Sequence, residues 1–128
     1  MNVINRKTKE IRLQHGKFLN NQYLTIDAQH KIYITKGACT LCDLTINDYV
    51  HFLNEDDDWR FYVDDNADGF KPTPVATKGG VNINHKGLAR MILKSTGFPQ
   101  GKRFYVQKTN TLHDRCPVFR LSPELSED

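Results

Sequence analysis

The stretch GGVNINHKGLARMILKSTGFPQGKRFYV, from Gly79 to Val106, contains the signals on which the fold prediction rests. Leu88, Met91 and Ile92 recur at the spacing of one helix face. Gly97 stands where a helix usually ends, and the Pro-Gln-Gly turn after it leads into the β-rich residues Arg-Phe-Tyr-Val. This stretch therefore predicts a strand, a short helix and a further strand in succession.

Two short motifs of this stretch occur again upstream, which indicates an internal duplication. The motifs are Thr-Lys-Gly, at residues 35–37 and 77–79, and Arg-Phe-Tyr-Val, at residues 60–63 and 103–106. The two occurrences of each motif are about 42 residues apart. We interpret the stretches from Ile32 to Val63 and from Pro74 to Val106 as two diverged copies of one strand-turn-strand-helix-strand unit.

The upstream copy also contains a pattern typical of a helix. Ile46, Tyr49, Val50 and Leu53 follow helical spacing, and Thr45 precedes them as a capping residue. β-rich segments on either side of the Lys-Gly corners predict a hairpin before each helix: residues 32–35 with 39–42, and residues 75–77 with 81–84. Further strands are predicted at Tyr23–Ile26, Ile11–Leu13 and Val118–Leu121.

The predicted fold class is α+β and mainly β. A unit of a few strands and one short helix cannot bury its apolar face alone, so we expect the copies to pack as a pseudo-twofold pair in a small β-barrel. The predicted organisation is an N-terminal arm or added hairpin over residues 1–30, a first repeat over 31–70, a second repeat over 71–122 and a tail over 123–128. Residues 31–122 would form one compact domain.

Composition indicates a soluble protein without a membrane partner. Of the 128 residues 38% are apolar, and no stretch approaches the roughly 20 apolar residues that span a membrane. The basic N-terminus has no apolar run behind it, so a secretory signal is not predicted. Three cysteines are too few for a disulfide framework. We therefore expect a cytoplasmic protein with reduced thiols.

Charge is distributed unevenly along the chain. Residues 1–36 hold seven basic and two acidic side chains, residues 37–69 hold one and nine, and residues 70–128 hold ten and four. Two basic ends thus flank an acidic middle. A polyanionic partner would have to contact the ends and avoid the acidic middle.

The stretch from Gly79 to Val106 resembles the AbrB-type swapped-hairpin (SpoVT/AbrB-like) family of bacterial regulators and antitoxins. The resemblance implies a glycine corner, a strand, a short helix rich in Leu and Arg, a turn and a strand. It also implies that two copies interlock into a small barrel that presents basic residues to DNA. Here both copies would come from one chain, as a tandem duplication. Two features depart from the family pattern: Lys36 and Lys78 are the only basic residues at the corners, and the proline before the helix is absent.

The resemblance and the basic ends predict a small DNA-binding regulator or antitoxin-type protein, built as a tandem pseudo-dimer and present as a monomer or homodimer. Double-stranded DNA would be its partner, held by cations that neutralise phosphates. Lys86 and Arg90 equally fit the solvated face of the second helix. The candidate DNA-binding residues are Lys31, Lys36, Lys71, Lys78, Lys86, Arg90, Lys102 and Arg103.

The acidic middle of the chain supports an alternative prediction. A non-catalytic inhibitor or DNA-mimic-like protein of a phage or mobile element could use its acidic first repeat to bind another protein. The candidate protein-binding residues are Glu55, Asp56, Asp57, Asp58, Asp64 and Asp65.

Metal and catalytic motifs are weak in this sequence. Cys39-x-x-Cys42 and His113-x-x-Cys116 could supply four zinc ligands, although Cys39 also fits an ordinary apolar position. Residues 64–69 match the opening of a calcium loop but lack its closing glutamate. Phosphate loops, nucleophile elbows and H-E-x-x-H motifs are absent. We therefore predict a protein that is not an enzyme and that uses no cofactor or metal.

Overall fold

The computed structural model describes residues 21–123. The predicted strand at Ile11–Leu13, most of the predicted arm and residues 124–128 of the predicted tail lie outside this range. Within it, neither helix is long and apolar enough to cross a membrane. The elements in chain order are β1 (Tyr23–Ile26), β2 (Ile32–Ile34), α2 (Lys36–Cys42), β3 (Tyr49–Glu55), β4 (Asp58–Asp64), β5 (Thr73–Pro74), β6 (Val81–Ile83), α3 (Lys86–Thr96), β7 (Phe104–His113) and β8 (Cys116–Ser122).

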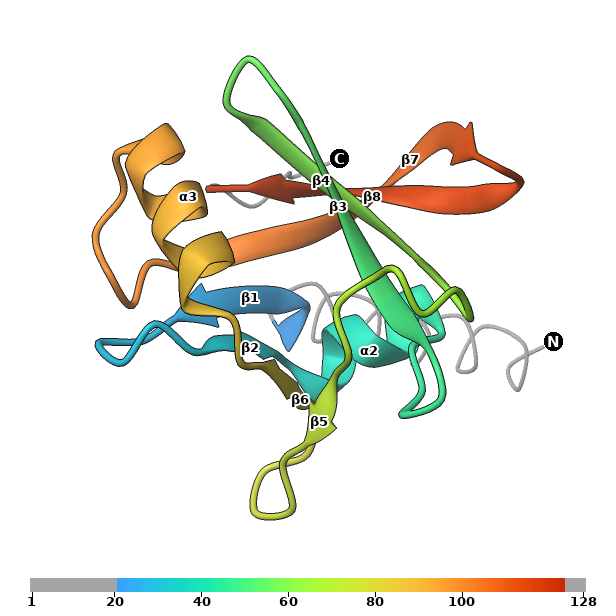
Figure 1. Cartoon of the computed structure of the whole chain (residues 1–128), viewed down its shortest axis with the longest axis horizontal. Coiled ribbons are helices and arrows are strands. Elements are labelled where there is room, and N and C mark those ends of the chain that lie inside the picture. Colours follow the sequence, from blue (N-terminus) through green and yellow to red (C-terminus); the bar gives the residue numbers. More distant parts are fainter. Residues whose placement is uncertain (1–20, 124–128) are drawn as a thin grey trace, which may run out of the picture.

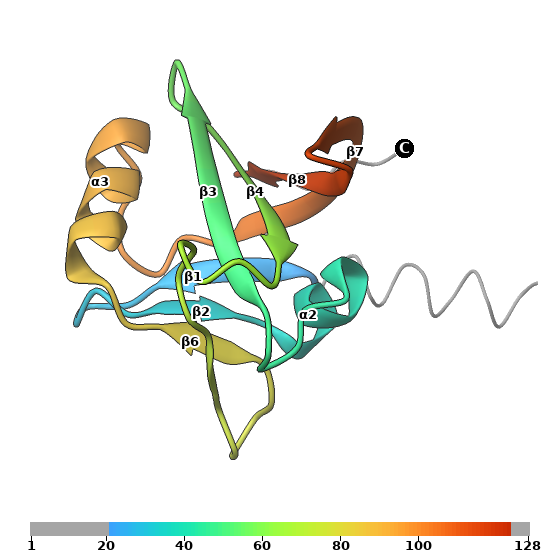
Figure 2. The ribbon, with the colours of Figure 1, turned by 45° about the vertical axis from the view of Figure 1, so that its right-hand side comes forward.

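The strands form one curled antiparallel sheet. Its eight strands lie in the order β3-β4-β8-β7-β1-β2-β6-β5. The sheet curls so that the β3–β4 hairpin stands across β1, β2 and β6, while α3 and α2 lie on opposite sides of the molecule (Figures 1 and 2). The two edges of the sheet approach each other, because Val50 and Phe70 exchange backbone hydrogen bonds of 2.9 and 2.8 Å. The result is a half-barrel that is mainly β, in agreement with the predicted fold class.

The core fills the inside of this curl. Leu24 and Ile26 of β1 and Ile32 and Ile34 of β2 are fully buried, whereas the residues between them face outward. This alternation is the period-two pattern of a strand with one buried face. Helix α3 adds three buried side chains to the core: Leu88, Ala89 and Ile92.

Several predicted elements are confirmed. Helix α3 begins after His85, whose Nδ1 accepts a hydrogen bond of 3.0 Å from the Leu88 N–H, and it ends at Gly97 in the left-handed conformation. In the second-copy hairpin the strand predicted over residues 81–84 corresponds to β6, but the strand predicted over residues 75–77 is wrong, because β5 ends at Pro74 and residues 76–78 form the turn. The strands predicted at residues 23–26, 60–63, 103–106 and 118–121 correspond to β1, β4, β7 and β8.

The first-copy helix predicted over Ile46–Leu53 is wrong. Tyr49–Glu55 is strand β3, and the Thr45 N–H and hydroxyl both donate to Asp48 Oδ2 at 2.9 Å. These bonds close a turn instead of starting a helix. Two residues of the predicted helix face then pair across the hairpin with β4, Val50 with Val63 and Leu53 with Arg60. Cross-strand packing therefore overrides the helical spacing.

The first-copy hairpin return at Cys39–Cys42 is also wrong, because these residues belong to α2. Thr35 caps that helix, its hydroxyl accepting from the Ala38 N–H at 3.2 Å. As a consequence, Thr35-Lys36-Gly37 leads into a helix whereas Thr77-Lys78-Gly79 lies in the β5–β6 turn. The residue-by-residue pairing of the two predicted copies is therefore wrong.

Gly80 provides a test of the β5–β6 connection. Its φ is +76°, and an added Cβ would lie 2.4 Å from the carbonyl oxygen of Ile34. We expect Gly80→Ala to lower the free energy of unfolding by more than about 2 kcal/mol, because left-handed strain and a backbone clash combine. Urea denaturation measures this change.

The control is Gly97→Ala, at which φ is +72° but no atom lies within 4 Å of the added Cβ. This variant should lose only about 1 kcal/mol, because it carries the conformational strain without the clash. Equal losses in the two variants would contradict the close approach of β6 to β2.

Candidate functional site

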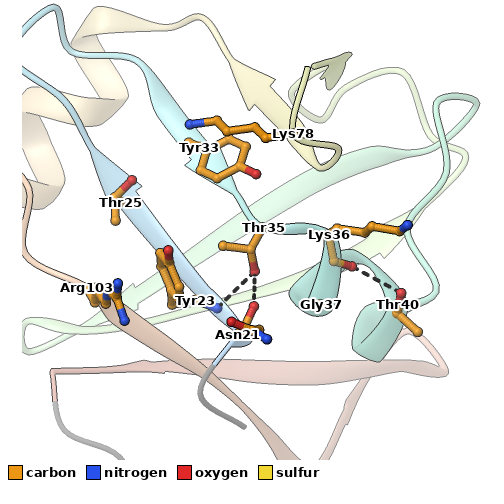
Figure 3. Close-up of a pocket in the computed structure, with 10 residues that line it drawn as sticks. All are labelled: Asn21, Tyr23, Thr25, Tyr33, Thr35, Lys36, Gly37, Thr40, Lys78 and Arg103. Atoms are coloured by element: carbon orange, nitrogen blue, oxygen red, sulfur yellow. Dashed lines mark hydrogen bonds between the residues drawn. The ribbon is translucent and has the colours of Figure 1, made fainter. Parts of the chain in front are cut away.

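A pocket of about 690 Å³ opens on the outward face of β1 and β2 (Figure 3). Its floor consists of Tyr23 and Thr25 from β1 and of Tyr33 and Thr35 at and just beyond β2. Tyr23, Thr25 and Tyr33 alternate with the core residues of the same strands, so burial of the core turns them outward, whereas Thr35 is itself buried. The rest of the lining comprises Asn21, Lys36, Gly37, Thr40, Lys78 and Arg103.

Three cations from separate segments line this pocket. Lys36 is the first residue of α2, Lys78 lies in the β5–β6 turn, and Arg103 directly precedes β7. The Lys78 Nζ lies 3.9 Å from the centre of the Tyr33 ring, and the Arg103 Cζ lies 4.4 Å from the centre of the Tyr23 ring. None of the ten lining residues is acidic. The pocket is therefore suited to an anion that also has an apolar or aromatic part.

The hydroxyl of Thr35 joins the elements that form the floor. It accepts hydrogen bonds of 3.2 Å from the N–H groups of Tyr23 and Ala38, and it donates to the carbonyl oxygen of Asn21. Gly37 also packs closely here, since an added Cβ would lie 2.7 Å from that same oxygen. One buried side chain thus connects β1, the end of β2 and the start of α2.

Tyr33 holds the turn that carries Lys78. Its hydroxyl donates a hydrogen bond of 2.9 Å to the carbonyl oxygen of Gly79, the residue after Lys78. Burial raises the pKa of Tyr33 above its ordinary value, with smaller contributions from Tyr23 and Cys39. The phenol therefore remains a hydrogen-bond donor at neutral pH, and the turn remains attached to β2.

The structure brings together three of the eight predicted DNA-binding residues, Lys36, Lys78 and Arg103, and places the others elsewhere. Lys71 donates to the carbonyl oxygen of Ile46 at 2.7 Å and lies 4.9 Å from the Tyr49 ring centre. Lys102 lies 5.6 Å from the centre of the Phe98 ring. Lys31 is exposed before β2, and Lys86 and Arg90 are exposed on α3.

Tyr23 and Tyr33 are functional candidates that the sequence reasoning missed. The signal that could have found them is the alternation of YLTI and IYI, in which the tyrosines occupy the positions opposite to the core. That signal places a side chain on the outer face but does not say which cations lie beside it.

The acidic residues proposed for protein binding are divided between the two ends of β4. At one end Asp58 binds both Arg60 and Arg120, with nitrogen–oxygen distances of 3.0 and 3.1 Å. Asp57 accepts a hydrogen bond of 2.6 Å from the Ser95 hydroxyl of α3. Glu55 and Asp56 are exposed beside them at the tip of the β3–β4 hairpin.

At the other end of β4, Asp64 lies 2.6 Å from the Nε2 of His51 and accepts a bond of 2.9 Å from the Asn66 N–H. That backbone bond, followed by the bond from His51, lowers the pKa of Asp64 despite partial desolvation. Asp65 is exposed next to it. A strand of seven residues separates the groups by roughly 20 Å, so the six acids do not form one surface.

The predicted zinc ligands do not come together. Cys39 and Cys42 lie on α2, whereas His113 and Cys116 lie at the β7–β8 turn. Residues 21–123 contain no group of three or more His, Cys, Asp or Glu side chains able to hold a metal ion. Burial raises the pKa of Cys39 to about 11 and also raises that of Cys42, so both remain thiols.

The calcium-like loop over residues 64–69 has a structural explanation. Asp64 and Asn66 each use a side-chain oxygen to accept a hydrogen bond of 2.9 Å from the backbone N–H two residues further on. These bonds are Asx-turns, the usual role of Asp and Asn in a turn after a strand.

No family model, curated protein or solved structure matches this chain. Two tyrosine rings, three cations and several hydroxyl groups line this pocket, an arrangement whose chemistry suits anions.

Thr35→Val tests the role of the hydroxyl that joins the floor of the pocket. Removing it leaves the N–H groups of Tyr23 and Ala38 without their partner, so unfolding free energy should fall by about 2 to 3 kcal/mol. Thr35→Ser keeps the hydroxyl and should lose less than about 1 kcal/mol. Urea denaturation compares them, and equal losses would contradict a dominant role of the hydroxyl, because the methyl group would then contribute as much.

The pH dependence of stability tests the ion pairs of Asp58 with Arg60 and Arg120. Partial burial opposes its ionisation, but hydrogen bonds from Arg120 and Arg60, together with their charges, bring its pKa below the ordinary 3.8. A lowered folded pKa stabilises the fold above pH 3.8, and this contribution is lost as pH falls through the folded value. We therefore expect Asp58→Asn to be less stable than the wild type at pH 7, with a difference that shrinks on acidification to about pH 2.

Asp56→Asn is the control, because it removes the same charge from the neighbouring turn and keeps both arginine contacts. Denaturation midpoints across this pH range measure the effect. A difference between Asp58→Asn and wild type that does not change with pH would contradict the role of the ion pairs.

Proposed function

We propose that this protein is a small DNA-binding regulator or antitoxin-type protein that contacts DNA through the pocket on β1 and β2. The observation that carries this proposal is the convergence of Lys36, Lys78 and Arg103 around Tyr23 and Tyr33, with no acidic lining residue. Cations neutralise phosphates in a sequence-independent way, and this interaction weakens as salt is added.

The cations of the pocket are available for such a contact. Within residues 21–123, none of the three forms a salt bridge, whereas Arg60 and Arg120 share Asp58. Lys78 and Arg103, each held over a partly buried tyrosine ring, can exchange that contact for a stronger, charge-assisted bond to phosphate.

The order of elements supports the tandem pseudo-dimer part of the proposal. A hairpin, a helix and a second hairpin occur once over β1-β2-α2-β3-β4 and again over β5-β6-α3-β7-β8. Corresponding strands pair antiparallel, β2 with β6 and β4 with β8, as a pseudo-twofold arrangement of two units requires. We propose that the chain is a pair of such units with the AbrB-like, swapped-hairpin organisation.

The unit boundaries in this proposal differ from those that the Thr-Lys-Gly motifs indicated. Each helix begins with Lys-Gly, Lys36-Gly37 in α2 and Lys86-Gly87 in α3, so these dipeptides become the corresponding positions. The pocket then draws its tyrosines from the first unit and draws Lys78 and Arg103 from the second. A single unit would lack half of the proposed DNA surface.

The rival proposal, a protein-binding inhibitor or DNA mimic, has less support from the geometry. Asp57, Asp58 and Asp64 are already engaged by Ser95, by two arginines and by His51, respectively. Glu55, Asp56 and Asp65 remain exposed, and they lie at both ends of β4 rather than side by side.

Binding of the full chain to a random duplex across about 50 to 200 mM salt tests the DNA proposal. We expect binding that falls steeply with salt, and a Lys36→Ala/Lys78→Ala variant whose affinity at low salt is at least about tenfold weaker. Its salt slope should fall by about 2, one for each lost phosphate contact. Fluorescence anisotropy of a labelled duplex provides both quantities.

Lys86→Ala/Arg90→Ala is the matched control, because it removes the same charge from exposed positions of α3 that lie outside the pocket. It should retain most of the affinity. Equal loss in the two double variants would assign binding to net charge rather than to the pocket. Absence of binding by the wild type even at low salt would refute the DNA proposal and direct attention to protein partners of the acidic residues.

A further inference from the structure

We infer that the pocket on β1 and β2 accepts a single unpaired nucleotide of a DNA strand, with its base against the tyrosine floor and its phosphates on the surrounding cations. This inference rests on the proposed function and specifies the chemistry of the same site. It distinguishes the pocket from a surface that contacts only the phosphates of a duplex.

The size and shape of the pocket support one nucleotide. Its volume of about 690 Å³ lies within the range of roughly 300 to 1,000 Å³ that is usual for small-ligand sites. The cations stand at the sides, from the start of α2, the β5–β6 turn and the residue before β7, while the tyrosines and threonines form the floor (Figure 3). A flat base can enter such a hollow, whereas the bases of an intact duplex are stacked and present only their edges.

The two tyrosines are placed as neighbours across a strand pair. Thr25 pairs with Tyr33, and Tyr23 exchanges backbone and side-chain contacts with Thr35, so the rings occupy diagonal positions of the sheet. Outward-facing aromatic residues on adjacent strands are the platform on which unpaired bases stack in many single-strand-binding proteins. A site for phosphate alone would not require two aromatic rings.

The cation–ring contacts hold two of the cations beside the floor of the pocket. Lys78 lies over the ring of Tyr33 at 3.9 Å and Arg103 over that of Tyr23 at 4.4 Å, so a cation covers one face of each ring. Lys78 and Arg103 are exposed, so their side chains can move outward to a phosphate. That exchange would free the ring faces for the base at the moment when the phosphate arrives.

The test compares an oligothymidylate of about 12 nucleotides with an abasic oligomer of the same length and charge, binding to the full chain at one salt concentration. We expect the oligothymidylate to bind at least about fivefold more tightly, because only it offers bases for stacking. It should also bind more tightly than a duplex of the same length. Equal affinity for the oligothymidylate and the abasic oligomer would overturn the inference.

Tyr33→Leu should weaken binding of the oligothymidylate more than binding of the abasic oligomer, because the lost ring removes base stacking whereas the lost hydroxyl, which holds the Lys78 turn, affects both oligomers. Tyr49→Leu is the matched control, since Tyr49 also lies under a lysine, Lys71 at 4.9 Å, but outside the pocket. If Tyr33→Leu weakens both oligomers equally, the ring only positions Lys78 and the inference fails. If Tyr33→Leu does not fold, the comparison of the oligothymidylate with the abasic oligomer on the wild-type chain still tests the inference.

Competition by thymidine monophosphate distinguishes a site for a nucleotide within a DNA strand from a site for a free nucleotide. Thymidine monophosphate should compete weakly, and inorganic phosphate at the same concentration more weakly still. A monophosphate that competes as well as the oligomer would make this a site for free nucleotides, and phosphate that equals the monophosphate would remove the role of the base. Duplex binding without preference for unpaired bases would overturn this inference alone, whereas failure of every DNA to bind at low salt would refute the proposed function as well.

Discussion

The antiparallel pairing of β2 with β6 is the contact on which the rest of the structure depends. It joins Ile32 to Ile83 and Ile34 to Val81, and these side chains are almost completely buried in the core. Because strand residues alternate, the same pairing turns Tyr33 outward and brings the β5–β6 turn beside it. The core and the pocket are therefore two faces of one strand pairing.

Charged side chains have different partners at the tip of the β3–β4 hairpin and around the pocket. Near the tip of the β3–β4 hairpin, Arg60 and Arg120 form ion pairs with Asp58, so the charge of this carboxylate contributes to the stability of the fold. Around the pocket, Lys36, Lys78 and Arg103 meet no carboxylate, and two of them rest on tyrosine rings instead. Structural charges are thus paired, while the charges that face the pocket stay available to a ligand. This contrast is the physical basis of the proposed DNA contact.

The second half of the chain was more predictable than the first. Helix α3 spans 11 residues, has a capping residue and a terminal glycine, and follows one apolar spacing. Helix α2 has seven residues, and the helical spacing that follows it belongs to a strand. Short helices carry few turns of periodic signal, and Val50 fits the helical spacing although it pairs with Val63 in a strand. Pairing between strands therefore determined the secondary structure of the first half of the chain.

The sequence by itself determined the mainly β class, the position of α3 and the outward alternation of the tyrosines, because capping, glycine stops and residue periodicity act over a few neighbouring residues. It also indicated Lys78 as a turn residue, whereas Lys36, predicted at a corner as well, begins α2. Only the tertiary structure decided that these lysines meet Arg103 over a tyrosine floor, while Lys86 and Arg90 remain on the surface of α3. The reason is that strand order and the curl of the sheet arise from burial of the whole core, which no local pattern encodes.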